Sequence, residues 1–241
     1  GEPNLCRRTS LFSETPLDGT LAEFLELPVA NLVPLPDAVG FREAACLPTA
    51  YLTAYHMLFS SARLVPGDTV LVQGASGGVA TAAILLSRAA GVRVFATSRD
   101  ESKRRLAEDL GAAATFEPVR ESARAIFEAT GGRGVDAVIE TVGEPTWDLS
   151  LRAVRQEGTV VVAGATGGVN PPAQLNRIFW FRISVVGATM GSARELRRLV
   201  QLCADGSLRP LIGSVRALSD VAAGLREMAQ GETRGKIVIE P

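Results

Sequence analysis

A glycine-rich turn in the first half of the chain has the residue types and spacing that hold a phosphate. It lies between an apolar run, Val70–Val72, and a helix-forming run, Val79–Ala90. Strand, tight turn and helix in this order bring backbone N–H groups and a helix N-terminus to one point, which suits a phosphate. Glycine is needed because a Cβ atom would block the close approach of a pyrophosphate. The residues that we expect to hold it are Gly74, Ser76, Gly77, Gly78 and Val79.

The turn departs slightly from the common GxGxxG pattern. Its spacing is Gly74-x-x-Gly77-x-x-Ala80, one residue longer at the front. Many α/β proteins carry such a turn for packing alone, so the turn by itself favours nucleotide binding and a structural role about equally. A second apolar strand, Val92–Thr97, favours nucleotide binding. It ends about 20 residues downstream, where dinucleotide-binding domains place the residue that recognises the ribose.

The residues after that second strand indicate which dinucleotide binds. An NAD-binding domain usually has Asp or Glu there, to accept hydrogen bonds from the ribose 2′-hydroxyl. Here Ser98 and Arg99 take that place, and Lys103 follows one helical turn later. A hydroxyl and two cations suit a 2′-phosphate. Asp100 argues the other way, because it could pair with Arg99, although it could also serve only as a helix cap. We predict NADP as the cofactor, with NAD as the alternative.

A parallel sheet is needed to position these residues. Six predicted strands alternate with helices, which indicates an α/β, doubly wound Rossmann sheet in the order 3-2-1-4-5-6. The strands are Val70–Val72, Val92–Thr97, Ala113–Phe116, Val135–Glu140, Thr159–Ala163 and Ile183–Gly187. The crevice beyond the carboxyl ends of the first and fourth strands is then the ligand site. It also receives Thr141, Val142, Gly164, Ala165 and Thr166.

Composition excludes several classes of partner. The 241 residues are 46% hydrophobic and 21% charged, which is ordinary for a soluble globular protein. The net charge of −1 gives no reason to expect nucleic acid, and no apolar run reaches the roughly 18–20 residues of a membrane span. Three widely spaced cysteines, Cys6, Cys46 and Cys203, argue against a disulfide framework. We therefore expect a cytoplasmic protein that acts on a small molecule.

The two ends of the chain differ from the central alternation. Residues 1–36 contain short apolar stretches interrupted by prolines, and Leu21–Leu27 and Asn31–Val33 could be strands. Two or three strands cannot bury a core unaided, so this segment is interpreted as the end of a β-rich domain. At the other end, the helices Ala193–Ala204 and Ser219–Gln230 precede a last strand, Lys236–Ile239.

Four motifs together resemble the medium-chain dehydrogenase/reductase family. They are PDAVGFREAACLPTAYLTAYHML, PGDTVLVQGASGGVATAA, GVDAVIETVG and GKIVIEP, and they occur in the family's order across essentially the whole chain. The closest resemblance is to the quinone oxidoreductase-like and zinc-type alcohol dehydrogenase-like branches. It implies a Rossmann domain, residues 46–190, between a GroES-like catalytic segment, residues 1–45, and a return to that domain, residues 191–241. Family members carry roughly a further hundred residues before this point, so most of the catalytic domain is expected to be missing from this sequence.

The resemblance also implies roles for single residues. Thr53 matches the helix threonine that contacts nicotinamide, and Tyr51 is a candidate hydrogen-bond donor to the developing oxyanion, or simply a packed side chain. Thr49 stands where a catalytic zinc would need a cysteine, and Cys6 matches only one of four ligands of a structural zinc. We therefore expect no zinc. Family members also pair through the sixth strand, which predicts a homodimer with Ile183 and Val185 near the axis.

The function expected from these features is hydride transfer between NAD(P)H and a small carbonyl, quinone or activated alkene. A short-chain reductase is excluded because it needs a Tyr-x-x-x-Lys pair, and the residues four beyond Tyr51 and Tyr55 are Tyr55 and Phe59. A methyltransferase is disfavoured because no acid precedes Asp100 at the second strand end. The open alternative is a non-catalytic NADP-binding module or an inactive fragment. Because much of the substrate wall is expected to be missing, slow turnover or none is expected of this chain.

Overall fold

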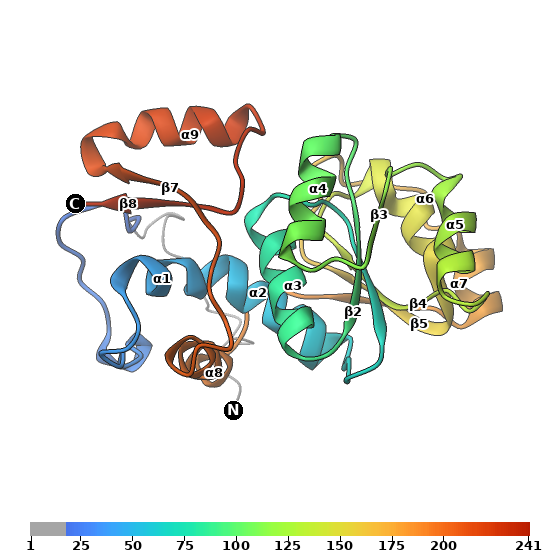
Figure 1. Cartoon of the computed structure of the whole chain (residues 1–241), viewed down its shortest axis with the longest axis horizontal. Coiled ribbons are helices and arrows are strands. Elements are labelled where there is room, and N and C mark those ends of the chain that lie inside the picture. The colour runs from blue at the N-terminus through green and yellow to red at the C-terminus, as the bar shows by residue number, and fades with distance from the viewer. Residues whose placement is uncertain (1–17) are drawn as a thin grey trace.

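The computed structural model describes residues 18–241, and its centre is a six-stranded parallel sheet (Figure 1). The strands are β1 (Thr69–Val72), β2 (Arg93–Thr97), β3 (Ala114–Phe116), β4 (Val135–Glu140), β5 (Val154–Val162) and β6 (Ser184–Gly187). Their order is β3-β2-β1-β4-β5-β6. The predicted Rossmann-type α/β fold and strand order are confirmed.

Helices cover both faces of this sheet and bury alternate residues of each strand. Val70 and Val72 of β1 belong to one hydrophobic core, and Leu71 between them belongs to a second. Because successive side chains of a strand point to opposite faces, the two cores lie on opposite sides of the sheet. The first core is formed with α3 (Gly78–Ala89), α4 (Glu101–Leu110) and α8 (Ala193–Ala204), and the second with α5 (Ser122–Ala129), α6 (Glu144–Ala153) and α7 (Leu175–Phe181).

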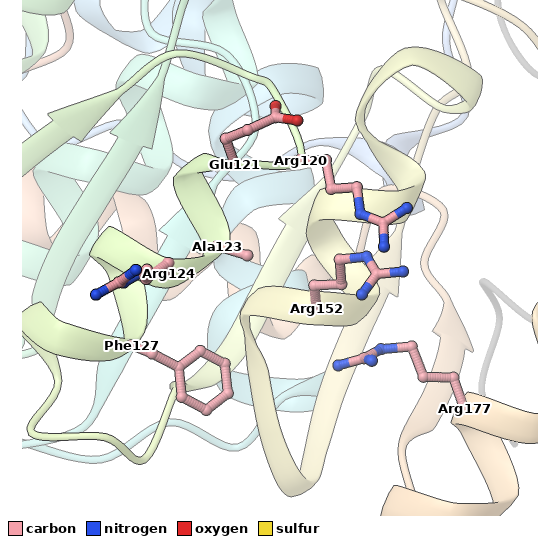
Figure 2. Close-up of a pocket in the computed structure, with 7 residues that line it drawn as sticks. All are labelled: Arg120, Glu121, Ala123, Arg124, Phe127, Arg152 and Arg177. Carbon is pink, nitrogen blue, oxygen red and sulfur yellow. The ribbon is translucent and has the colours of Figure 1, made fainter.

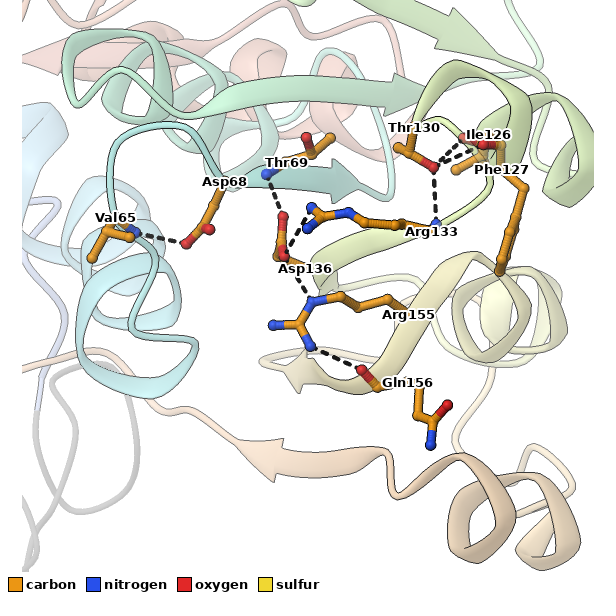
Figure 3. A network of polar contacts seen from close by, with 11 residues as sticks. Val65, Asp68, Thr69, Ile126, Phe127, Thr130, Arg133, Asp136, Arg155 and Gln156 are labelled. Atoms are coloured by element: carbon orange, nitrogen blue, oxygen red, sulfur yellow. Dashed lines mark hydrogen bonds and ion pairs between the residues drawn. The ribbon is translucent and has the colours of Figure 1, made fainter.

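At the amino end of the sheet, one carboxylate holds three strands together by hydrogen bonds (Figure 3). Asp136 on β4 accepts hydrogen bonds from the backbone N–H of Thr69 at 2.7 Å and from Nε of Arg155 at 2.7 Å. The side chain of Asp136 is only 7% exposed, so these donors offset the cost of burying its charge. Asp136 thereby ties the starts of β1, β4 and β5 together at the edge opposite the predicted crevice.

A continuous helical stretch from Phe41 to Ser61 leads into the sheet. It consists of α1 (Phe41–Cys46), a π-helical segment (Leu47–Tyr51), α2 (Leu52–Tyr55) and a second π-helical segment (His56–Ser61). Pro48 lacks an N–H to donate, and the helix widens there instead of breaking. The predicted domain boundary at residue 46 falls inside this stretch.

The C-terminal part forms a smaller unit beside α1 (Figure 1). It contains β7 (Ile212–Ala217), α9 (Val221–Ala229) and β8 (Lys236–Glu240), and β7 pairs with β8 in a parallel two-stranded sheet. The sequence predicts β8 but not its partner. The main chain of this unit reaches the glycine-rich turn, since the N–H of Gly235 donates to the carbonyl oxygen of Ser76 at 2.8 Å.

Some local predictions are wrong. Among the described residues before α1 there is no strand, and Val29–Asn31 forms one 3-10 turn, because no neighbouring strand offers hydrogen bonds to this segment. β5 begins at Val154, five residues before the predicted start at Thr159. The sequence pattern also does not predict the helix α7. No helix within residues 18–241 combines the length and the apolar character needed to cross a membrane.

Candidate functional site

The turn after β1 has the geometry of a phosphate cradle. Gly74 has φ of +93°, which favours glycine, and its N–H donates to Oγ1 of Thr97 on β2 at 3.2 Å. The helix α3 starts at Gly78 with Gly77 as its N-cap, and no side chain caps it. A Cβ on Gly77 would meet no atom within 4 Å. The first N–H groups of α3 are therefore open to an anion, and the positive end of the helix dipole favours one.

A lysine that the sequence analysis did not single out lies at the same helix terminus. A Cβ on Gly78 would lie 3.0 Å from Cδ and 3.8 Å from Nζ of Lys236, so the lysine stem covers the first turn of α3. No ion pair or hydrogen bond of its ammonium group occurs among the described residues. A cation beside the positive end of a helix is unfavourable without an anion between them. Lys236 belongs to the motif GKIVIEP. That motif supported the family resemblance and was not used to assign a role to the lysine.

The end of β2 presents a free arginine. Asp100 is the N-cap of α4 and accepts from the N–H groups of Ser102 and Lys103, so it serves as a cap and makes no ion pair with Arg99. The pKa of Asp100 lies below its usual value because Ser102 and the helix N–H groups bind the carboxylate. Arg99 is exposed, and its guanidinium makes no ion pair or hydrogen bond within the described part of the chain. Lys103 is engaged elsewhere, since its Nζ donates to the carbonyl oxygen of Gly231 at 2.6 Å.

The loops after β4 and β5 lie against each other. The N–H of Thr166 donates to the carbonyl oxygen of Thr141 at 3.3 Å, and the N–H of Gly167 donates to that of Val142 at 2.7 Å. Gly143 has φ of +90°, and a Cβ there would lie 2.2 Å from the carbonyl oxygen of Gly168. These contacts bring the predicted residues Thr141, Val142, Gly164, Ala165 and Thr166 to one edge, beside the glycine-rich turn that follows the neighbouring strand β1.

A buried side-chain network, absent from the sequence analysis, holds the loop after β4 in place. Glu140 at the end of β4 is 0% exposed and accepts hydrogen bonds from the N–H groups of Val142 and Gly143, at 2.8 and 3.0 Å. It also accepts from the hydroxyl groups of Thr146, at 2.9 Å, and Ser150, at 2.6 Å. These donors satisfy a carboxylate that is buried without a cation.

The network continues to the glycine-rich turn. Nε2 of Gln73 donates to Oγ of Ser150 at 2.9 Å, and Oε1 of Gln73 accepts from Thr97 at 2.6 Å. Thr97 in turn receives the N–H of Gly74. Five side chains thus fix the loop after β4, the glycine-rich turn and the end of β2 relative to one another, which preorganises their backbone for a ligand.

The two candidate residues on the helical stretch from Phe41 to Ser61, Tyr51 and Thr53, are both buried. Tyr51 is 0% exposed, and its hydroxyl accepts the N–H of Leu211 at 2.8 Å. Burial is the main reason that the pKa of Tyr51 is raised. This position favours the packed-side-chain interpretation over donation to a substrate. Thr53 is 7% exposed, on α2 where that helix packs against α3 and α8.

The described residues carry no complete set of zinc ligands. No three His, Cys, Asp or Glu side chains come together as a metal-binding group among residues 18–241, and Cys6 lies outside the described residues. Cys46 and Cys203 are buried free thiols, and burial raises the pKa of both, to about 11 for Cys203. A thiol that stays protonated is a poor zinc ligand. We therefore assign no step to zinc.

Residues 78–205 match the family described as "Zinc-binding dehydrogenase". Among curated proteins, the chain is 31% identical over 220 residues to quinone oxidoreductase-like protein 2 of Bos taurus, covering 87% of this chain and 63% of that protein. The chain thus spans less than two thirds of that relative.

Solved structures agree with this assignment. An NAD-dependent alcohol dehydrogenase superposes with a TM-score of 0.92 at 34% identity, covering 99% of this chain and 69% of its own. A mycobacterial protein solved in complex with NADPH gives a TM-score of 0.85 at 28% identity, covering 93% and 72%. The family match covers more than half of the chain, and the chain belongs to the zinc-binding dehydrogenases of the medium-chain dehydrogenase/reductase family.

Proposed function

We propose that this chain binds NADP(H) in the crevice and takes part in hydride transfer to or from a small carbonyl, quinone or activated alkene. The observation that carries the proposal is the uncapped N-terminus of α3 with Lys236 beside it. That site has N–H donors, a helix dipole and a cation, which together suit a pyrophosphate. Relatives that are quinone oxidoreductase-like or were solved with NADPH support the same proposal.

Each crevice loop has a separate task in this proposal. The N–H groups of Gly78 and Val79 and the ammonium of Lys236 hold the pyrophosphate. Arg99, with the hydroxyl of Ser98, holds the 2′-phosphate that distinguishes NADP from NAD. The loops Thr141–Gly143 and Gly164–Thr166, with Thr53, border the nicotinamide half. When bound, the cofactor would supply or accept the hydride. The network around Glu140 holds the loop Thr141–Gly143 relative to the glycine-rich turn, and backbone hydrogen bonds join it to the loop Gly164–Thr166.

The competing proposal is a non-catalytic NADP-binding module. It is supported by the burial of Tyr51, which leaves no assigned donor for an oxyanion. A turnover assay separates the two: the chain is mixed with NADPH and a panel of quinones and enones, and NADPH absorbance is followed beside elemental analysis for zinc. Saturable NADPH oxidation supports the enzyme. Tight NADPH binding without oxidation supports the module, and stoichiometric zinc with fast turnover would contradict our assignment of the site.

We also propose that the chain forms a homodimer in a reducing compartment such as the cytoplasm. β6 is an edge strand of the sheet, with Val185 42% exposed, and the preceding helix α7 exposes Phe179 and Trp180. Ile183, expected near the axis, is instead only 6% exposed within the chain's own core, so Val185 is the better candidate. A second copy that pairs with β6 would cover this edge.

A further inference from the structure

A second pocket, built from residues that the cofactor crevice does not use, lies among α5, α6 and α7 (Figure 2). Its volume is about 450 Å³, and its walls include Ala123 and Phe127 of α5 together with arginine side chains. Figure 2 shows the guanidinium groups of Arg120, Arg152 and Arg177 along one side of the pocket, whereas that of Arg124 points away from them. Three cations from three different elements thus border one cavity.

The carboxylates near these arginines do not balance their charge. Asp148 binds Nε of Arg152 at 2.9 and 3.0 Å and lies 3.9 Å from Nε of Arg120. Within residues 18–241, no carboxylate oxygen lies within 4.0 Å of Arg177, whose Nε donates instead to the carbonyl oxygen of Leu151 at 3.0 Å. Glu121 also lines the pocket and forms no ion pair within 4.0 Å among the described residues. Two carboxylates, Asp148 and Glu121, therefore stand against three guanidinium groups.

The wall that carries Arg177 is held in place by α6. Nε1 of Trp147 donates to the carbonyl oxygen of Pro172 at 3.0 Å, and Nε2 of Gln174 donates to Oδ1 of Asp148 at 2.8 Å. The guanidinium of Arg177 also stacks over the ring of Phe181, 4.9 Å from its centre. These contacts keep Arg177 near Arg152 although the two charges repel each other. Burial lowers the pKa of Arg177, and the charge of Arg152 lowers it further.

Arginine supplies 23 of the 25 basic residues of this chain, so exposed guanidinium groups are common on its surface. This pocket differs from the rest of that surface because its arginines converge on a cavity with an apolar wall and exceed their carboxylate partners. An oxyanion between them would relieve the repulsion, and guanidinium groups bind phosphate in a bidentate manner.

We propose that this pocket binds a small phosphate monoester, with the phosphate between Arg120, Arg152 and Arg177 and the organic group against Phe127. Inorganic phosphate shares the charged half of this chemistry but cannot use the ring of Phe127. The proposal is independent of the cofactor crevice, because no crevice residue lines the pocket.

The test is calorimetric titration of the full chain with phenyl phosphate and, separately, with inorganic phosphate. Arg120→Gln is the test variant: this side chain is 66% exposed, so its replacement leaves folding intact. Arg105→Gln is the matched control, because it removes the same charge from a side chain that is 73% exposed, is paired with Glu101 and does not line the pocket. We expect one phenyl phosphate per chain, an affinity at least tenfold weaker in Arg120→Gln, and less than a twofold change in Arg105→Gln. Phe127→Leu should weaken phenyl phosphate and leave inorganic phosphate unchanged.

Three results would overturn the proposal. The first is no saturable binding of phenyl phosphate at millimolar concentration. The second is an equal loss in Arg120→Gln and Arg105→Gln, which would indicate general charge attraction. The third is loss of the signal on adding NADP or in Lys236→Met, which would place the phosphate in the cofactor crevice. An unchanged signal in Lys236→Met supports a separate site, whether or not the chain binds NADP.

Discussion

At the scale of single residues, the choice between the two cofactors depends on Arg99. Asp100, which could have neutralised it, caps α4 instead. Lys103, predicted as a second cation for the 2′-phosphate, is bound to the carbonyl oxygen of Gly231. The preference for NADP over NAD is therefore expected to depend on the guanidinium group of Arg99 and the neighbouring hydroxyl of Ser98.

Replacing Arg99 by alanine should weaken NADPH binding by about 1–3 kcal/mol, the scale of a charged hydrogen bond, and leave NADH binding unchanged. Calorimetric titration of both cofactors measures the difference. Arg105→Ala is the control, because Arg105 lies on α4, the helix that follows Arg99, is 73% exposed and pairs with Glu101. An equal loss for NADPH and NADH would mean that Arg99 does not contact the 2′-phosphate.

Lys236 should act on both cofactors alike, because NADPH and NADH share the pyrophosphate. Lys236→Met keeps the stem that covers Gly78 and removes only the charge. We expect NADPH and NADH to lose affinity by a similar factor, about tenfold for one charge-assisted contact, with the melting temperature unchanged. A loss confined to NADPH would instead place Lys236 at the 2′-phosphate.

At the scale of elements, one buried carboxylate holds α8 against the helical stretch from Phe41 to Ser61. Glu195 accepts from Nδ1 of His56 at 2.9 Å, from Ser60 and from the N–H of Ser192 at 2.6 Å. Burial works to raise the pKa of Glu195, but the hydrogen bonds from Ser60, Ser192 and His56 outweigh it and lower the pKa from 4.5 to about 2.

This contact predicts an acid-sensitive stability. A carboxylate whose pKa is lower in the folded state stabilises the fold above its unfolded value of 4.5 and loses that contribution as the pH falls toward 2. The loss should amount to about 3 kcal/mol, since the side chain is only 9% exposed. Denaturant unfolding between pH 6 and pH 2 measures it. Glu195→Gln should be less stable at pH 6 and show a shallower pH dependence, and an identical slope in both proteins would assign the acid sensitivity to other groups.

The strands of the six-stranded sheet and their order could be predicted from the sequence. Strands such as Val70–Val72 are apolar throughout and followed by glycine, so β1 to β6 and their order follow from pattern alone. β7 was missed because Ile212–Ala217 contains glycine and alternates between half-buried and exposed residues, with none fully buried. α7 was missed because it starts after Gln174, in a left-handed conformation and without a side-chain cap.

Candidate residues were predictable where they follow the carboxyl end of a strand, as Gly74, Arg99 and Thr141 do. Lys236 and Glu140 could not be assigned in this way. Lys236 reaches the glycine-rich turn across 158 positions of sequence from Gly78, the difference between residue numbers 236 and 78. The role of Glu140 depends on the hydrogen-bond donors of α6 and of the loop that follows β4, which the strand pattern does not reveal.

At the scale of the whole molecule, the sheet ends in an edge that is open along β6. If two copies pair there, light scattering at micromolar concentration should give twice the mass of 25.4 kDa. Val185→Lys should shift the population to the monomer, since a charge in a continuous sheet interface is costly. Val215→Lys is the control, because Val215 is 38% exposed and lies on β7, away from β6. A monomer in the unmodified chain would rule out this pairing.

The central claim is that the crevice beside α3 binds NADP(H). Its most direct test is a calorimetric titration of the unmodified chain with NADPH and with NADH under one set of conditions. We predict saturable binding of one cofactor per chain, with NADPH the tighter ligand because only it engages Arg99. Absence of binding by either cofactor would contradict the assignment of the crevice, and equal affinities would contradict the assignment of Arg99.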